Sequence, residues 1–365
     1  MSAETKDRIL KTLMVIATIY FFLLSINLLG HSFKLFGKGF AEAMLQMTSN
    51  PFAGLIIGVV ATSLIQSSST TTSLVVGMVA GGALTLEHSI PIIMGANIGT
   101  TITNSLVSMG HVTNRVEFRR AFGASIVHDF FNIFAVIVLF PLEMKFHFIQ
   151  HTAVYMEGLF AGAGGLKVFN PLKAILNPVI NLIDHLISYL PLSEYIMLVV
   201  SLVGLFAALT FLIRTIRTMM LDKIEKIINN YLFKNDFMGF TWGVGMTLVV
   251  QSSSVTTSLI VPLAGAGVVS IRQIFPYTLG ANIGTTGTAI LAALATQNHI
   301  AITVAFAHLF FNIYGILLLY PLRFIPIRTA EFVARKAAES TSNLVIFVTI
   351  YILLHFIPVA LIFLG

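Results

Sequence analysis

Two stretches of 35 residues, 52–86 and 237–271, contain no charged residue. A straight α-helix of that length would extend about 52 Å, whereas the hydrocarbon core of a bilayer is about 30 Å thick. Each stretch is interrupted by a polar run that begins Gln-Ser-Ser-Ser, at Gln66 in the first and at Gln251 in the second. The sequence therefore predicts two helical hairpins that enter a membrane and return to the same side, each with a polar turn at depth.

The composition places the chain among integral membrane proteins. Hydrophobic residues make up 56% of the sequence and charged residues 10%, against about a quarter charged in soluble proteins. Uncharged runs at 12–30, 195–213 and 344–365 are long enough to cross as helices, and a β-barrel is excluded because its strands alternate polar and apolar residues. The absence of cysteine excludes disulfides and thiolate metal sites. We therefore expect an all-α integral membrane protein.

A second motif, Gly-Ala-Asn-Ile-Gly-Thr-Thr, occurs at 95–101 and again at 280–286. Both this heptapeptide and the polar run recur at a separation of 185 residues. The duplication predicts two structural repeats, 1–185 with hairpin 52–86 and 186–365 with hairpin 237–271, which together form a single transmembrane domain.

The distribution of Lys and Arg predicts the orientation. The loop 111–120 carries three arginines, whereas its counterpart 296–299 carries none, so the two loops should lie on opposite sides of the membrane. A cytoplasmic N-terminus places 16 of the 21 Lys and Arg residues in the cytoplasm. The net charge of +6 is thus a topology signal and not a footprint for nucleic acid.

This orientation requires an odd number of crossings in the first repeat, which 12–30, 88–110 and 121–142 provide. The segment 143–194 is then interfacial or loop structure, and the two repeats are inverted. The stretches 214–234 and 327–340 have charges on one face and should lie on the cytoplasmic surface against anionic lipid. Inverted repeats with broken helices place a binding site near the membrane midplane, where the repeats meet.

Neither polar turn nor heptapeptide contains Lys or Arg, so an anion there must be bound by backbone amides and hydroxyl groups. The helix that follows each turn begins with unpaired N–H groups and a positive dipole end, and serine hydroxyls add donors suited to a tetrahedral oxyanion. The candidate anion ligands are Ser67, Ser68, Ser69, Ser252, Ser253, Ser254, Asn97 and Asn282.

The neighbouring oxygen-bearing side chains suit a hard cation such as Na+. The candidates are Gln66, Gln251, Thr100, Thr101, Thr285, Thr286 and Asp129. Asp129 is the one acid inside the predicted 121–142 helix, and a structural role for it is slightly favoured. A bound cation would offset the buried negative charge of the anion, which predicts that the two are transported together. No transition metal is expected.

Each of these features also has a structural interpretation. Ser and Thr in membrane helices often bond back to their own helix, and the glycines of the heptapeptides can simply permit close helix packing. His128 and His308 fit polar contacts between helices better than ligand binding, so we place them outside the site.

The paired polar runs, the segment from Pro91 to Thr101, and the run from Glu117 to Asn132 resemble the type II sodium-dependent phosphate cotransporter family, in a bacterial version. The similarity covers most of the chain apart from the extreme N-terminus and 143–194. It implies Na+-coupled import of inorganic phosphate across the cell inner or plasma membrane, with the two polar runs forming the transport site. Animal members have a large disulfide-bonded extracellular loop between the halves, and its properties do not carry over to this shorter, cysteine-free segment.

Alternating access is the mechanism that this interpretation favours, with Na+ as coupling ion and no other cofactor. Two alternatives remain open: a symporter of another oxyanion, such as sulfate or a carboxylate, and an ion channel with re-entrant filter loops. An enzyme is the least favoured class, because the sequence has no metal-binding pattern of His with Glu or Asp on one helix face. The one candidate pair, His128 and Asp129, is adjacent, and its side chains therefore point to different faces of the helix.

Overall fold

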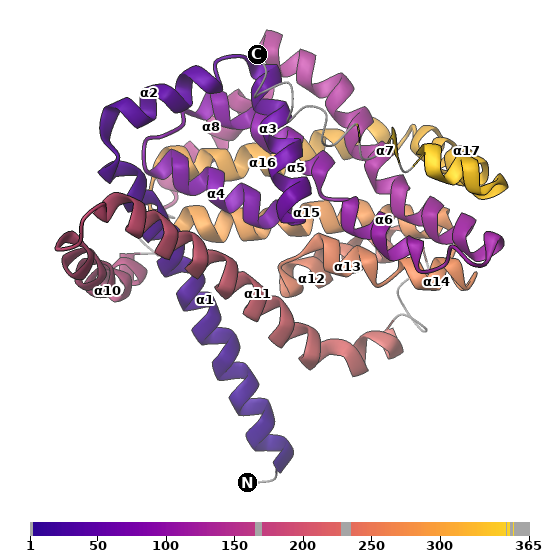
Figure 1. Ribbon diagram of the computed structural model, residues 1–365, viewed down its shortest axis with the longest axis horizontal. Coiled ribbons are helices and arrows are strands. Elements are labelled where there is room, and N and C mark those ends of the chain that lie inside the picture. Colours follow the sequence, from indigo (N-terminus) through magenta and orange to yellow (C-terminus); the bar gives the residue numbers. More distant parts are fainter. Residues whose placement is uncertain (1–2, 165–169, 228–234, 348, 351–352, 354–365) are drawn as a thin grey trace.

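The computed structural model describes residues 3–164, 170–227, 235–347, 349–350 and 353, and the regular elements within these ranges are helices (Figure 1). Six of the described helices are long and apolar enough to cross a membrane. These are Thr5–Leu35, Leu86–Met109, Arg115–Phe146, Ser193–Leu212, Ile271–Thr296 and His299–Leu319. The predicted all-α membrane class is thereby confirmed. The predicted run 344–365 lies largely outside the described residues.

The first polar run separates two helices, α3 (Pro51–Ile65) and α4 (Ser68–Ala80). Helix α3 ends because Gln66 adopts the left-handed conformation, with φ of 57°. Ser67 is extended, and its side chain caps α4 by accepting a hydrogen bond from the amide of Thr70. The chain therefore breaks at two residues in the polar run.

The second polar run produces the same backbone. Helix α12 (Asp236–Val250) ends at the left-handed Gln251, with φ of 60°, and the extended Ser252 caps α13 (Ser253–Ser258). A short helix, α14 (Val261–Gly265), follows α13. Helix α12 begins and ends 185 residues after α3, and α13 begins 185 residues after α4.

The heptapeptides lie in α5 (Leu86–Gly99) and α15 (Ile271–Thr296). In the first half the helix breaks at Thr100 and Thr101 and resumes as α6 (Ile102–Met109), whereas α15 is continuous. This difference between the halves is not visible in the matched motifs.

The heptapeptide glycines allow backbone-to-backbone packing. A Cβ atom at Gly95 would lie 1.9 Å from the carbonyl oxygen of Leu55 in α3, and one at Gly280 would lie 2.0 Å from that of Phe240 in α12. Helix α3 thus packs directly along α5, and α12 along α15. The structural interpretation of these glycines is confirmed.

The remaining helices surround these two pairs. Helix α1 (Ala3–Leu35) packs along α11 (Ser193–Ile227), α7 (Arg115–Phe146) along α17 (Phe324–Glu339), and α16 (His299–Leu319) against α15 and α8 (Phe148–Gly162). Helices α2 (Gly37–Met47) and α3 meet at a bend of 98°. The region predicted as interfacial or loop structure is mainly helical, comprising α8 and α10 (Asn170–Ser188), and neither helix has the length and apolar composition of a crossing.

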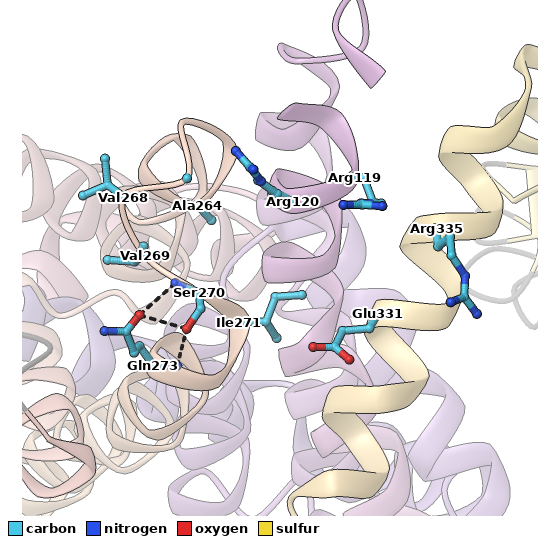
Figure 2. A pocket seen from close by; sticks show the side chains of 11 residues that line it. Arg119, Arg120, Ala264, Val268, Val269, Ser270, Ile271, Gln273, Glu331 and Arg335 are labelled. Atoms are coloured by element: carbon cyan, nitrogen blue, oxygen red, sulfur yellow. Dashed lines mark hydrogen bonds between the residues drawn. The ribbon is translucent and has the colours of Figure 1, made fainter. Parts of the chain in front are cut away.

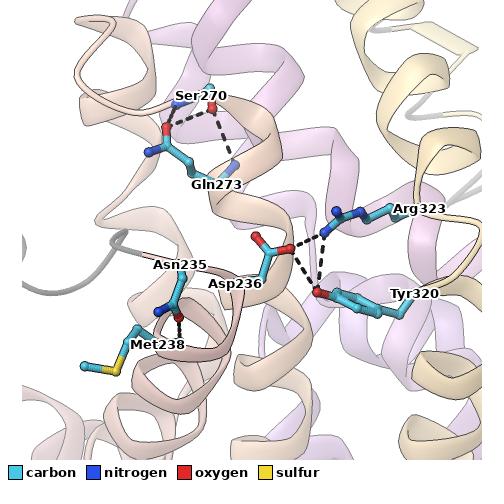
Figure 3. A network of polar contacts seen from close by, with 7 residues as sticks. All are labelled: Asn235, Asp236, Met238, Ser270, Gln273, Tyr320 and Arg323. Atoms are coloured by element: carbon cyan, nitrogen blue, oxygen red, sulfur yellow. Dashed lines mark hydrogen bonds and ion pairs between the residues drawn. The ribbon is translucent and has the colours of Figure 1, made fainter.

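A polar network fixes the start of the second hairpin (Figure 3). Arg323 and the hydroxyl of Tyr320, which follow α16, both donate to the carboxylate of Asp236, the first residue of α12. Partial burial raises the pKa of Asp236, but the hydrogen bonds from Arg323 and Tyr320 outweigh it and hold the pKa below its usual value. The carboxylate therefore stays charged and anchors α12 to the end of α16.

Candidate functional site

The two polar runs are in direct contact. The hydroxyl of Ser254, in the second run, lies 3.5 Å from the carbonyl oxygen of Gln66, in the first. The same hydroxyl donates to the carbonyl oxygen of Thr100 at 3.2 Å, at the break between α5 and α6. Asn104 of α6 donates to the hydroxyl of Thr257 at 2.9 Å. The structure thus brings together one polar run from each half and the broken heptapeptide helix.

The helix that follows each turn presents free amides. Ser67 and Ser252 cap only the third amide of their helices, at 3.2 Å and 3.3 Å. The first two amides of α4 and the first two of α13 meet no acceptor in the part of the chain that the structure describes. Such amides are the donors that bind anions at helix N-termini.

The serine hydroxyls are also arranged as donors. The oxygens of Ser67 and Ser252 already accept a backbone hydrogen bond, which leaves their O–H groups to donate. Ser68, Ser69 and Ser253 are 2–3% exposed, and their hydroxyls have no partner among the described residues. Ser254 differs, because its hydroxyl is used on the carbonyl of Thr100.

The heptapeptide threonines offer hydrogen-bond acceptors, whereas the serines of the polar turns offer donors. Each of their hydroxyls donates to a carbonyl oxygen three or four residues earlier in its own helix, at 2.6–3.2 Å. These residues are Thr100, Thr101, Thr285 and Thr286. The expected bonding back to their own helix is confirmed here. Because the proton is used, each oxygen offers only lone pairs to a further partner, which is what a cation requires.

The two glutamines share a backbone conformation but not their side-chain contacts. The carbonyl oxygen of the buried Gln251 side chain accepts a hydrogen bond from Thr288 at 2.7 Å. Gln66 is exposed, and Thr103, the counterpart of Thr288, has a buried hydroxyl without a hydrogen-bond partner in the described chain. Neither threonine is among the site residues predicted from the sequence, although each follows its glutamine by 37 residues.

The side chains of the heptapeptide asparagines form hydrogen bonds with other groups of the protein. The side chain of Asn282 meets the ring of His128 at 2.5 Å and donates to Asn132 at 2.9 Å. Asn132 donates in turn to the carbonyl of Asn97 at 2.7 Å, while the Asn97 side chain donates within its own helix. The predicted role of His128 as a polar contact between helices is confirmed. Ligand binding by Asn97 and Asn282 stays a prediction.

The site lacks the features of a metal centre within the described residues. No group of three or more His, Cys, Asp or Glu side chains converges there. Asp129 is 3% exposed in α7, and its predicted choice between a cation and a structural role stays open. The groups that meet at the turns are therefore amides, hydroxyls and carbonyls, which are neutral.

Comparison with known proteins tests the resemblance. The sequence profile of a family described as Na+/Pi-cotransporter matches residues 21–167 and 205–319, which include both polar runs and both heptapeptides. The chain belongs to this family. The family membership confirms the resemblance that the motifs indicated.

Mammalian members of the Na+/Pi-cotransporter family align with most of the chain. It is 34% identical to sodium-dependent phosphate transport protein 2A of Rattus norvegicus, over 92% of the chain and 65% of that protein. It is 33% identical to sodium-dependent phosphate transport protein 2B of Homo sapiens, over 92% of the chain and 64% of that protein. The chain thus spans slightly less than two thirds of the length of these relatives. No solved structure matches it.

Proposed function

We propose that the chain is a Na+-coupled symporter that imports inorganic phosphate by alternating access, and that it catalyses no chemical reaction. Membership of the Na+/Pi-cotransporter family supports the substrate and the coupling ion. The observation that carries the proposal is the contact of Ser254 with Gln66 and Thr100, which joins one polar turn from each half into one site.

In this proposal phosphate lies between the two polar turns. The free amides that begin α4 and α13 and the hydroxyl donors of the serines would surround its oxygens. The proposed ligands are Ser67, Ser68, Ser69, Ser252, Ser253, Ser254, Asn97 and Asn282. The side-chain amides of Asn97 and Asn282 each use one hydrogen, on Ile93 and Asn132, and have a second one to donate. For Ser254 this role requires that its hydrogen bond to Thr100 open.

Sodium would bind to the neighbouring acceptors. The proposed ligands are Gln66, Gln251, Thr100, Thr101, Thr285, Thr286 and Asp129. The amides, hydroxyls and carbonyls at the turns carry no charge to balance a divalent anion, and burying such an anion without a counter-charge is costly. Na+ bound alongside supplies that charge, which explains the coupling of the two ions.

The proposed topology consists of inverted repeats, 1–185 and 186–365, with re-entrant turns that approach from opposite faces. The matched helix bounds of the two hairpins support the repeat, and the arginines of 111–120 support the inversion. With the N-terminus in the cytoplasm of a cell inner or plasma membrane, both turns reach the midplane.

Unequal contacts at equivalent residues support alternating access. The second hairpin is closed by a bond between Thr247 and Thr256 at 2.8 Å, whereas Thr62, the counterpart of Thr247, has no hydrogen-bond partner in the described chain. Turns with the same backbone conformation but unequal contacts around them are expected of one of two interchangeable states.

Uptake of labelled phosphate into proteoliposomes tests the proposal. We expect accumulation against a phosphate gradient when Na+ is outside, and none when K+ replaces it. Equal uptake in Na+ and K+ would refute the coupling. Abolition of uptake by excess sulfate would indicate another oxyanion as substrate, and flux that never exceeds equilibrium would indicate a channel.

A further inference from the structure

A pocket of about 470 Å³ lies between α7, the loop that joins α14 to α15, and α17 (Figure 2). It shares no residue with the polar turns or the heptapeptides. We propose that this pocket is a second anion site, which binds a phosphate group without transporting it.

The charges that line the pocket favour an anion. Arg119 and Arg120 reach it from α7 and Arg335 from α17, whereas Glu331 is its one lining carboxylate. None of these four side chains forms an ion pair with another described residue. The pocket therefore has a net charge of +2 from its lining. A single guanidinium group can bind two phosphate oxygens at once, so arginines that line a pocket suit a phosphate group.

The backbone adds donors at the same place. Ser270 caps α15, and its capping box with Gln273 fixes the first turn of this 26-residue helix at the pocket wall. The amides of Ile271 and Arg272 find no acceptor in the described chain. The positive end of the helix dipole thus adds to the charge of the three arginines.

The pocket also connects the two halves. Arg120 lies over the backbone at Gly267, where a Cβ atom would be 2.5 Å from its guanidinium nitrogen. Gly267 belongs to the segment by which the second hairpin returns to α15, while Arg120 belongs to the first half. An anion bound here would hold the second hairpin against α7. It would therefore favour one conformation of the site without occupying it.

The neighbouring helix α17 has the side chains of a helix at a membrane surface. Phe324 and Phe332 are each 51% exposed on this helix. Arg328 and Arg335 lie over their rings at 5.8 Å and 5.7 Å. Exposed aromatic rings beside arginines are typical of a helix at a membrane surface. The ligand chemistry is a phosphate group, either the monoester headgroup of an anionic lipid such as phosphatidic acid or a free phosphate from the aqueous phase.

Binding of short-chain phosphatidic acid to the purified full-length chain, in neutral detergent and Na+-free buffer, tests the proposal. Phosphatidylcholine of the same chain length is the reference lipid. We expect Arg335→Gln and Arg120→Gln each to weaken phosphatidic acid binding about tenfold, as for loss of one charge-assisted hydrogen bond. Glu331→Gln should strengthen it, because the one opposing charge is removed.

Arg328→Gln is the matched control, because Arg328 lies on the same helix, stacks on an aromatic ring, and does not line the pocket. Equal weakening by Arg328→Gln and Arg335→Gln would overturn the proposal in favour of general surface charge. Val268→Glu provides a second test, since Val268 is exposed and lines the pocket, and a carboxylate there should abolish binding. Unchanged binding in Val268→Glu would also overturn it.

Inorganic phosphate distinguishes the two sources. Displacement of the lipid by inorganic phosphate, with the same sensitivity to Arg335→Gln, supports a free anion as the ligand. Retention of the lipid under those conditions supports the headgroup. If Arg335→Gln binds both the lipid and inorganic phosphate as well as the unmodified protein does, the proposed site is refuted. The proposed transport function is unaffected by that result, because uptake does not require this pocket.

Discussion

Thr288 donates a hydrogen bond of 2.7 Å to the side chain of Gln251, while the equivalent pair, Thr103 and Gln66, forms no hydrogen bond. The backbones of the two glutamines are nearly the same, with φ of 60° and 57°. The difference therefore lies around the turns: Thr103 follows the helix break at Thr100 and Thr101, whereas Thr288 lies on the continuous α15. If the halves exchange roles during transport, the two pairs should close alternately.

Cysteine cross-linking tests this alternation, and the natural sequence contains no cysteine to interfere. The contact between Thr247 and Thr256 tests the same exchange without removing a proposed Na+ ligand. We expect Thr247→Cys with Thr256→Cys to react with a short bifunctional thiol reagent in the state in which these threonines are in contact. The equivalent pair in the first half, Thr62→Cys with Thr71→Cys, should react in the opposite state. Adding Na+ and phosphate should then change the yields of the two pairs in opposite directions, as measured by electrophoresis after proteolysis between the cysteines. Parallel changes in both pairs would contradict the exchange.

Ser68→Ala and Ser253→Ala should each weaken phosphate transport. Both residues are 2–3% exposed, and their hydroxyls form no hydrogen bond with the described residues, so their loss removes a donor without breaking a protein contact. We expect the KM for phosphate to rise about tenfold, the usual effect of losing one hydrogen bond to a charged group. Ser258→Ala is the control, because its hydroxyl bonds within its own helix to Val255. An equal effect of the control would contradict a direct role for the other two serines.

Thr286→Val should weaken the binding of Na+ more than the binding of phosphate. Its hydroxyl donates to Ile283, so the side chain can offer only lone pairs to a ligand, and valine removes them at nearly constant volume. We expect a higher Na+ concentration for half-maximal uptake, with little change in the phosphate KM at saturating Na+. Thr241→Val is the matched control, since Thr241 makes the same helical bond to Phe237 on an exposed surface. A rise in the phosphate KM alone would contradict the assignment of Thr286 to the cation.

The backbone of the turns could be predicted from the sequence because it depends on local chemistry. A serine that follows a glutamine at the end of an apolar helix caps the next helix, and the same residues gave the same break at Ser67 and at Ser252. The apolar lengths likewise predicted the helices that are long enough to cross a membrane.

The partners of the polar side chains could not be predicted in the same way, because they depend on packing between distant segments. His128 and Asn282 are 154 positions apart, and no local pattern indicates that they meet. The heptapeptide also does not predict the break at Thr100 and Thr101, since the identical heptapeptide in α15 is continuous. The residues that follow it differ, beginning with Ile102 in one half and Gly287 in the other. Thr103 and Thr288 could have been selected from the sequence, because they match at the same offset as the two repeated motifs. A single threonine in a helix, however, gave no reason to select them.

Gly95→Ala and Gly280→Ala should destabilise the protein through packing alone. The added methyl groups would lie 1.9 Å and 2.0 Å from backbone carbonyl oxygens, so α3 must move from α5, or α12 from α15. Overpacking of this kind costs about 1–3 kcal/mol when side chains can adjust, and backbone atoms cannot adjust as easily. We expect each variant to unfold at a clearly lower temperature in detergent. Gly245→Ala, in α12 with no atom within 4 Å of the added methyl group, should leave that temperature unchanged or raise it slightly. If Gly245→Ala were as harmful as Gly280→Ala, helix flexibility and not close packing would explain the glycines.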